Sequence, residues 1–143
     1  MRTKQISVFL ENRRGRLADV TRLLAERQIN IRALCVAETV DYGVLRLVVN
    51  DPDRACKALA EEGFTVTETD VLAVEVADQP GGLSQVVEPL AKADINVEYL
   101  YAFVGRSGGK AIVVFRVEDL DGAIELLKQQ GVRMLKAEEV YAL

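Results

Sequence analysis

Hydrophobic residues follow two periodicities along this chain, and the change from one to the other predicts its elements. Apolar residues at every second position predict half-buried strands around residues 6–10 and 72–76. A run at helical spacing follows each strand and predicts an amphipathic helix with one buried face. The two runs are Leu17, Val20, Leu23 and Leu24, and then Leu83, Val86, Val87 and Leu90.

The same order of elements occurs twice because the sequence carries an internal repeat. Residues 15–31 match residues 81–97 with a shift of 66 positions. The shift becomes 68 further along, since the segment Gly105–Gly109 is longer than Asp41–Gly43. We expect Gly105–Gly109 to form a hairpin turn, because glycine accepts the backbone angles of tight turns.

Each copy continues with two further strands and a second helix. In the first copy the strands cover residues 31–38 and 44–49. An aspartate that can cap the first turn precedes the second helix of each copy, and a glycine follows the helix. These residues are Asp51 and Gly63 in the first copy, and Asp119 and Gly131 in the second.

A closing strand completes each copy, at residues 64–69 and 132–137, in the order βαββαβ. The sequence therefore predicts an α+β fold of two ferredoxin-like βαββαβ units in tandem, at residues 1–70 and 71–143. In such units an antiparallel sheet carries its helices on one face. Because a unit of this size buries only about 60% of its surface, we expect the two units to pack together.

One strand of the second copy is apolar on both sides. Its residues on one side are Tyr99, Tyr101 and Phe103, and those on the other are Leu100, Ala102 and Val104. We expect this strand to be covered on both faces, either by the other copy or by a second chain in a homodimer.

Composition narrows the classes of function. The net charge is −4, and the excess of acidic residues lies in the second half, which makes nucleic acid a poor partner. The chain has no histidine, the commonest general base and metal ligand. Its two cysteines, Cys35 and Cys56, are far apart and form no CxxC pair. We therefore expect reduced structural thiols, no catalytic residues, no metal and no cofactor.

The pattern of apolar residues also predicts the cellular setting. No apolar run is long enough to cross a membrane. The residues after Met1 lack the apolar segment of a secretory signal. We therefore expect a cytoplasmic protein that makes no contact with membranes.

The loop between the first strand and first helix of each copy carries the candidate binding chemistry. Glycine lets the backbone approach a ligand closely, and the free amides at a helix N-terminus can receive a carboxylate. The first loop also holds Arg13, Arg14 and Arg16, which the helix dipole disfavours. We expect an anion to offset them, either a ligand carboxylate or the protein's own acidic side chains, such as Glu11.

A second candidate is the asparagine that follows the first helix of each copy, Asn30 and Asn96. A carboxamide offers both a donor and an acceptor, which suits a zwitterionic amino acid. Asparagine also tolerates left-handed backbone geometry at a helix C-terminus, so a purely structural role is an equal alternative. The repeat does not decide between the two roles.

Both copies resemble ACT domains, the small amino-acid-sensing modules of metabolic enzymes, and the chain resembles the stand-alone tandem-ACT proteins. The resemblance covers nearly the whole chain, and its motifs occur twice in the same order and spacing. The usual pattern is an acidic or amide residue followed by Pro-Gly-x-Leu. The second copy fits it at Asp78, Pro80, Gly81 and Leu83, whereas the first has Arg14 in place of the proline.

The resemblance implies a non-catalytic regulatory protein that binds a small ligand, usually an amino acid, at interfaces between ACT units. The ligand would be held by amides of the strand-to-helix loop and by the asparagine or its neighbours. The implied residues are Asn12, Arg14, Gly15, Arg16, Leu17, Asn30 and Ile31 in one set, and Asp78, Gly81, Gly82, Leu83, Asn96 and Val97 in the other.

The two sets differ, so we expect two unequal sites. Pro80–Gly82 would give the flexible site, while Arg14 and Arg16 would close the other. Replacing Gly82 with valine should then impair binding with the fold largely intact. Allosteric regulation would act through a partner, such as a metabolic enzyme, or through assembly as a homodimer.

Other functions occur on this topology. Acylphosphatase-like enzymes are disfavoured, because their glycine-rich loop signature followed by Phe-Arg is absent and no nucleophile with a neighbouring base is present. The aromatic strand Tyr99–Phe103 could stack RNA bases, but the acidic second half lacks the basic residues that RNA binding needs. The main alternative is a ligand-free dimerising accessory subunit of a metabolic enzyme.

Overall fold

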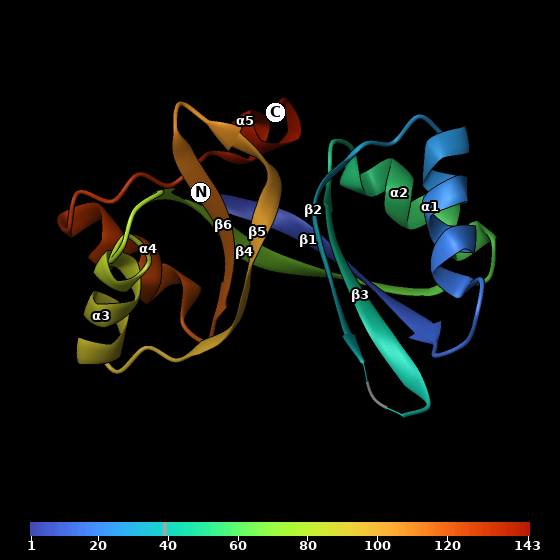
Figure 1. The fold of residues 1–143 in the computed structure, drawn as a ribbon, viewed down its shortest axis with the longest axis horizontal. Helices are drawn as coiled ribbons and strands as arrows, with labels where there is room; N and C mark the ends of the chain where they lie inside the picture. The colour runs from blue at the N-terminus through green and yellow to red at the C-terminus, as the bar shows by residue number, and fades with distance from the viewer. Residues whose placement is uncertain (39) are drawn as a thin grey trace. The chain divides into compact units, whose positions relative to one another are not determined.

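The computed structural model describes residues 1–38 and 40–143. For residues 105–107 it describes the backbone alone. Figure 1 shows the order of elements along the chain. In the first copy they are β1 (Arg2–Glu11), α1 (Arg16–Glu26), β2 (Ile31–Glu38), β3 (Tyr42–Val49) and α2 (Pro52–Glu61). A long strand, β4 (Thr65–Ala77), follows, and the second copy continues with α3 (Ser84–Lys92), β5 (Val97–Ser107), β6 (Lys110–Val117), α4 (Leu120–Gln129) and α5 (Ala137–Tyr141). The predicted α+β class is confirmed.

By compactness the chain divides into two units, and each is described by itself. The first unit is Lys4–Thr69 with Tyr141–Leu143, and the second is Asp70–Val140 with Met1–Thr3. The division between Thr69 and Asp70 falls inside β4. The first three residues therefore group with the second copy, and the last three group with the first.

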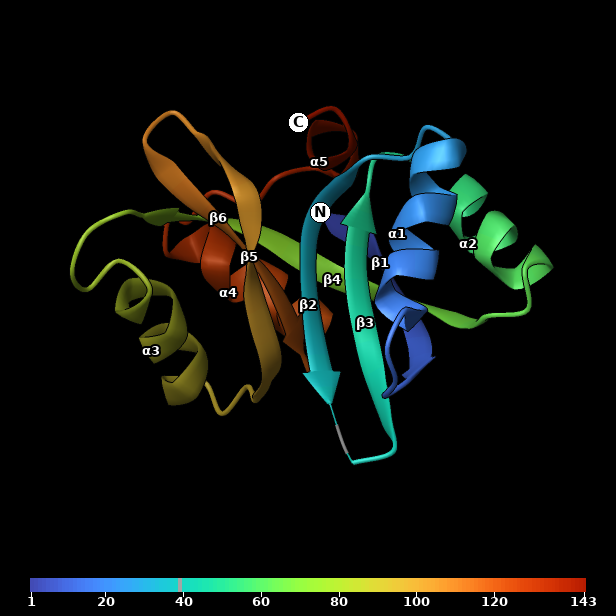
Figure 2. The ribbon, with the colours of Figure 1, turned by 45° about the vertical axis from the view of Figure 1, so that its right-hand side comes forward.

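The first unit is an antiparallel sheet with helices on one face. Strand β3 pairs with β1 on one side and with β2 on the other. Alternate residues of each strand point to the helices. Among them, Ile6 is paired across the strands with Leu47, and Val8 with Leu45. These side chains form one buried core with those of α1 and α2. Figure 2 shows the two helices on the same side of the sheet.

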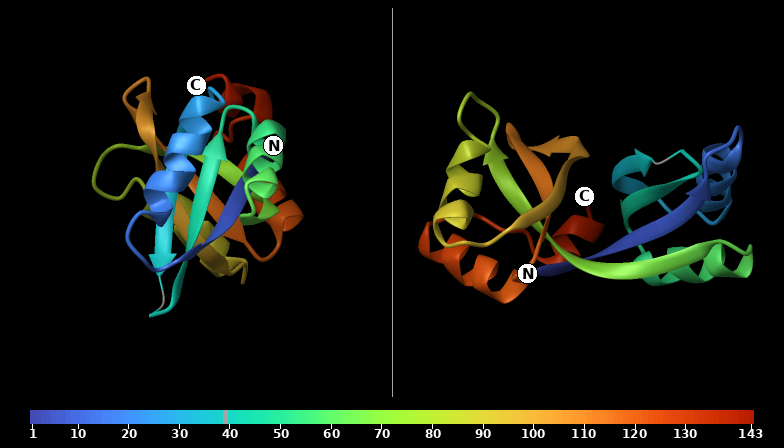
Figure 3. Two further views of the ribbon diagram at one scale, coloured as in Figure 1. Left: turned by 90° about the vertical axis from the view of Figure 1, so that its right-hand side faces the viewer. Right: turned by 90° about the horizontal axis from the view of Figure 1, so that it is seen from below.

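The second unit repeats this arrangement. Strand β6 pairs antiparallel with β4 and with β5. Leu72 lies opposite Phe115 and Val74 opposite Val113. These residues pack with buried side chains of α3 and α4 in a second core, and Figure 3 shows both helices on one side of the sheet.

The predicted hairpin turn lies between β5 and β6. Gly108 has a φ of 56° and Gly109 a φ of 76°. A two-residue turn with positive φ at both positions is the type I′ turn, whose twist matches that of paired strands. The turn is therefore confined to the last two glycines of the predicted segment, and β5 extends up to it.

The closing strand predicted at residues 132–137 is wrong in extent. One β-bridge, between Val74 and Met134, joins this segment to β4. The chain then turns into α5, because the Glu139 carboxylate accepts a hydrogen bond from the Lys136 amide at 3.2 Å. This bond lowers the pKa of Glu139 and favours a helix over a longer strand.

The prediction for the apolar strand β5 holds on one of its faces. Tyr101 is only 7% exposed, so the aromatic side is covered and is not open to RNA bases. Val104, on the other side, is 73% exposed. Covering of that face, by the other copy or by a second chain, stays a prediction.

No helix in the described part of the chain is both long and apolar enough to cross a membrane.

Capping separates the helices into two kinds. Asp51 accepts a hydrogen bond from the Arg54 amide at 3.2 Å, and Asp119 accepts one from the Gly122 amide at 2.9 Å. These aspartates satisfy first-turn donors of α2 and α4, as the sequence predicts. The N-cap residues of α1 and α3 make no such bond.

We predict that Asp119→Ala lowers the free energy of unfolding by about 1 kcal/mol, because the first turn of α4 loses its acceptor. Asp119→Asn is the matched control, since asparagine caps as well as aspartate, and it should stay close to the wild type. Urea denaturation of the full chain measures both. Equal loss in the two variants would show that the carboxylate acts through its charge and not as a cap.

Candidate functional site

Two matching loops lead from β1 into α1 and from β4 into α3, and each turns on a glycine. Gly15 has a φ of 91° and Gly81 a φ of 85°, in the left-handed region that glycine adopts without strain. A Cβ atom at either position would meet no heavy atom within 4 Å. The backbone angle, and not crowding, therefore requires glycine at both positions.

The helices that follow these loops start without a side-chain cap, although in α3 the N–H groups of Gln85 and Val86 already donate to the carbonyls of Gly81 and Leu83, at 3.1 and 3.0 Å. The N-cap of α1 is Gly15, which has no side chain, and the N-cap of α3 is Leu83, whose side chain cannot accept a hydrogen bond. First-turn N–H groups have no acceptor within their own helix, and the helix dipole favours an anion beside them. The two candidate loops are thus chemically suited to receive a carboxylate.

The first loop is held by the neighbouring hairpin and by its own charges. Asn12 donates from its backbone N–H to the Asp41 carbonyl at 3.0 Å and from Nδ2 to the Val40 carbonyl at 3.2 Å. Arg13 pairs with Glu11 at 2.8 Å. The alternative in which the protein's own acidic side chains offset the arginines therefore holds for Arg13.

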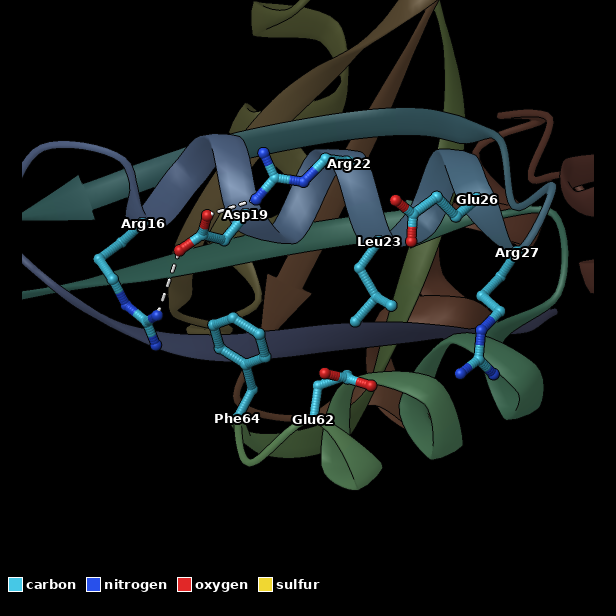
Figure 4. Close-up of a pocket in the computed structure, with 8 residues that line it drawn as sticks. All are labelled: Arg16, Asp19, Arg22, Leu23, Glu26, Arg27, Glu62 and Phe64. Carbon is cyan, nitrogen blue, oxygen red and sulfur yellow. Dashed lines mark hydrogen bonds and ion pairs between the residues drawn. The ribbon is translucent and has the colours of Figure 1, made fainter.

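Arg16 extends from the start of α1 toward Phe64, and its side chain is only 24% exposed. Its Nη1 is 3.3 Å from Oδ2 of Asp19, and its Cζ is 4.7 Å from the centre of the Phe64 ring. Such stacking of a guanidinium on an aromatic face is favourable. Figure 4 shows Arg16 reaching from α1 toward Phe64, across a pocket of about 310 Å³ that both residues line.

Phe64 is a residue that the sequence places in a strand and not in the site. Its contact with Arg16 depends on the turn between α2 and β4, which no local pattern links to α1. A signal does exist in the repeat, since Arg16 aligns with Gly82 and Phe64 with Val132. The arginine and the ring are thus absent together from the second copy.

The second loop folds tightly against its own strand. A Cβ atom on Gly82 would lie 1.9 Å from the carbonyl oxygen of Ala77. Gly82 also donates its N–H to the Gln79 carbonyl at 3.0 Å. The expectation that Gly82→Val leaves the fold largely intact is therefore wrong, because any side chain collides with the backbone.

The remaining loop residues lie on the surface. Leu83 is 40% exposed and Leu17 is 43% exposed. Arg14 and Asp78 are exposed as well. Large apolar side chains exposed at matching positions of both loops can contact a ligand or another protein surface.

The asparagines sit where the first helix of each copy gives way to a strand. The backbone N–H of Asn30 donates to the side-chain Oδ1 of Asn50 at 2.9 Å. The backbone N–H of Asn50 donates to the backbone carbonyl of Asn30 at 3.1 Å. Asn96 accepts the matching bond from the Glu118 amide at 3.0 Å. The left-handed backbone angles fall two residues earlier, on Gln28 and Asp94, so the structural alternative for the asparagines is wrong in its geometry.

Within each unit the loop and the asparagine lie far apart. Glu11, at the start of the first loop, pairs with Tyr42, whereas Ile31, next to Asn30, pairs with Val49. These partners are the two ends of β3, about 23 Å apart at the usual rise per residue. The structure therefore does not bring the loop residues and the asparagine together inside the first unit. In the second unit, Ala77 before the loop and Val97 beside Asn96 pair with opposite ends of β6, so these residues are equally far apart.

Asn96 and Val97 line a pocket of their own, of about 460 Å³. Its charged residues are Asp94 and Glu118, so it is acidic and repels a carboxylate. Gly82 lines a different pocket on the same unit, described below.

Neither cysteine offers an activated nucleophile. Burial is the largest cause that raises the pKa of the Cys35 thiol, and it also raises that of Cys56, where the carboxylate of Glu68 adds to the effect. A raised thiol pKa leaves little of the reactive thiolate near neutral pH. Both cysteines are free.

The whole chain matches one protein family. Residues 1–143 match the family model described as an ACT domain pair. The comparison with curated proteins gives no match.

Several solved structures are similar. Protein BT0572 from Bacteroides thetaiotaomicron has 43% sequence identity and a TM-score of 0.94, over 100% of this chain and 98% of that one. The ligand-free regulatory subunit of aspartate kinase from Thermus thermophilus has 20% identity and a TM-score of 0.63, over 89% and 91% of the two chains. The same subunit from Thermus flavus has 20% identity and a TM-score of 0.59, over 90% and 92%.

We predict that Gly82→Ala lowers the free energy of unfolding by about 2–3 kcal/mol, because the backbone must move to admit a methyl group. Gly81→Ala is the matched comparison in the same loop. It has open space and should cost only about 1 kcal/mol, for the left-handed backbone angle. Chemical denaturation of both variants measures the difference, and a Gly82→Ala variant more stable than Gly81→Ala would contradict the close approach to Ala77.

Proposed function

Because the chain belongs to the family of ACT domain pairs, we propose that it is a non-catalytic regulatory protein that binds an amino acid at the loops before α1 and α3. The observation that carries this proposal is the absence of a side-chain cap at the start of these two helices. The amides of a first turn form a site for a carboxylate, the group that all amino acids share. Each copy also has the βαββαβ pattern of a ferredoxin-like unit, shortened at the end of the second copy.

A regulatory role is supported by the structural relatives. Regulatory subunits of aspartate kinase have the same fold as this chain. We extend the proposal to allosteric control of a metabolic enzyme by a cytoplasmic homodimer. Exposed leucines at matching positions of the two loops, Leu17 and Leu83, supply apolar surface for such contacts.

A ligand-free accessory subunit is the second candidate, and one observation favours it for the first copy. Asp19 pairs with both Arg16 and Arg22, at 3.3 and 2.7 Å. Arg13 pairs with Glu11. Two of the three loop arginines are thus offset by the protein itself, and they need no ligand carboxylate.

We predict that calorimetric titration of the full chain with each of the twenty L-amino acids detects binding of at least one. Micromolar affinity corresponds to about −8 kcal/mol and is readily measured. The absence of heat with every amino acid would contradict the sensing proposal and favour the accessory subunit.

A pair of variants tests the amide donors themselves. Leu83 has a φ of −66°, the angle that proline imposes, and Leu83→Pro removes one N–H at the start of α3. Leu83→Ala keeps the N–H and loses the side chain, so it is the matched control. We predict about tenfold weaker amino-acid binding for the proline variant than for the alanine variant. Equal affinities of the two folded variants would show that the Leu83 N–H plays no part in binding.

A further inference from the structure

The repeat places a groove beside the first helix of each unit, along the loop that follows the second helix. We call them the α1 groove and the α3 groove. The α1 groove is lined by Arg16, Asp19, Arg22, Glu26, Glu62 and Phe64. Their repeat partners, Gly82, Gln85, Glu88, Lys92, Gln130 and Val132, line the α3 groove. Two versions of one surface can therefore be compared within a single chain.

Arg16 divides the space in the first unit. It lines the pocket of about 310 Å³ beside α1 and also a pocket of about 350 Å³ over Phe9 and Tyr42. Figure 4 shows how Arg16 and Phe64 approach each other between α1 and the opposite loop. In the second unit the matching positions form one groove of about 470 Å³, because Gly82 has no side chain.

The charges of the two grooves are also arranged differently. In the α1 groove Asp19 is shared by two arginines. In the α3 groove the ion pairs gather at one end, where Arg133 and Lys110 contact Glu75 at 2.5 and 3.7 Å. Lys92 forms no ion pair with any described residue.

The middle of the α3 groove therefore has polar side chains that can bind a ligand. Lys92 is accompanied by the carboxamides of Gln85 and Gln130, which have no hydrogen bond within the described part of the chain. An ammonium and two carboxamides are suitable donors for a carboxylate. Glu88 accepts one hydrogen bond, from Ser84 at 3.0 Å, and its negative charge suits an ammonium group.

Size and polarity point to the same class of guest. A volume of about 470 Å³ lies within the usual range of small-molecule sites. Val86, Pro89 and Val132 add apolar surface for carbon atoms. The lining carries both charges, with Glu75 and Glu88 beside Lys92, Lys110 and Arg133, which suits a ligand that also carries both.

We propose that the α3 groove is the ligand site of this chain, for a zwitterionic amino acid, and that Arg16 stacked on Phe64 narrows the α1 groove. The ligand carboxylate is held by Lys92 with Gln85 and Gln130, and its ammonium faces Glu88. This inference rests on the proposed function, and it adds which unit binds and through which side chains. Gly82 forms part of the wall, so the groove opens beside the second loop.

The site is located by titrating the full-length, ¹⁵N-labelled chain with each of the twenty L-amino acids and recording amide chemical shifts. For any amino acid that binds, the shifts are expected to be largest at Gly82, Gln85 and Gln130. Largest shifts at Gly15 and Arg16 would overturn the inference and leave the proposed function standing. No shifts with any amino acid would overturn both.

Lys92→Ala tests the cation. Its matched control is Lys128→Ala, since both lysines lie in the last turn of a helix and Lys128 does not line the groove. The expected result is about tenfold weaker binding for Lys92→Ala and unchanged binding for Lys128→Ala. Equal affinity of the two variants would overturn the role of Lys92 in the groove.

The ammonium contact has its own probe. The N-acetyl derivative of the amino acid that binds most tightly keeps the carboxylate and lacks the positive charge. It is expected to bind about tenfold more weakly, because Glu88 loses its partner. Equal binding of both compounds would overturn the zwitterion and indicate a site for carboxylates in general.

Discussion

The left-handed turn at Gly15 and Gly81 is the constraint on which the candidate sites depend. It brings each chain segment into a helix whose N-cap residue, Gly15 or Leu83, has no side chain that can accept a hydrogen bond. The second helices of both copies start on aspartates that satisfy these same donors. Each copy therefore has one helix with a side-chain cap and one without, at equivalent places in the two copies.

Duplication of one backbone does not produce two equal sites. Arg16 and Phe64 lie against each other in the first copy, and their partners in the second are Gly82 and Val132. The second copy has glycine and valine in place of the arginine and the phenylalanine. The groove beside α3 is therefore wider than the groove beside α1, and it lacks the arginine's charge. A single chain can in this way narrow one groove with its own side chains and leave the other wider for a solute, while both copies support the same fold.

Much of this architecture could be predicted from the sequence, because periodicity and capping are local signals. The repeat, the order of strands and helices, and the caps at Asp51 and Asp119 all follow from such signals. The short pairing at Met134 could not, since the apolar pattern of residues 132–137 gives no sign that a helix begins at Ala137. The role of Gly82 was also hidden, because its contact with the Ala77 carbonyl arises only when the loop folds back.

The claim that an open helix start receives the carboxylate of a solute is tested most directly by a crystal structure of the chain grown with an amino acid that it binds. The predicted result is an amino acid in the α3 groove, with its carboxylate oxygens about 2.7–3.2 Å from the N–H of Leu83 or Ser84 and from the side chain of Gln85 or Lys92. A bound amino acid remote from both first turns, or a protein side chain capping each of them, would contradict the claim.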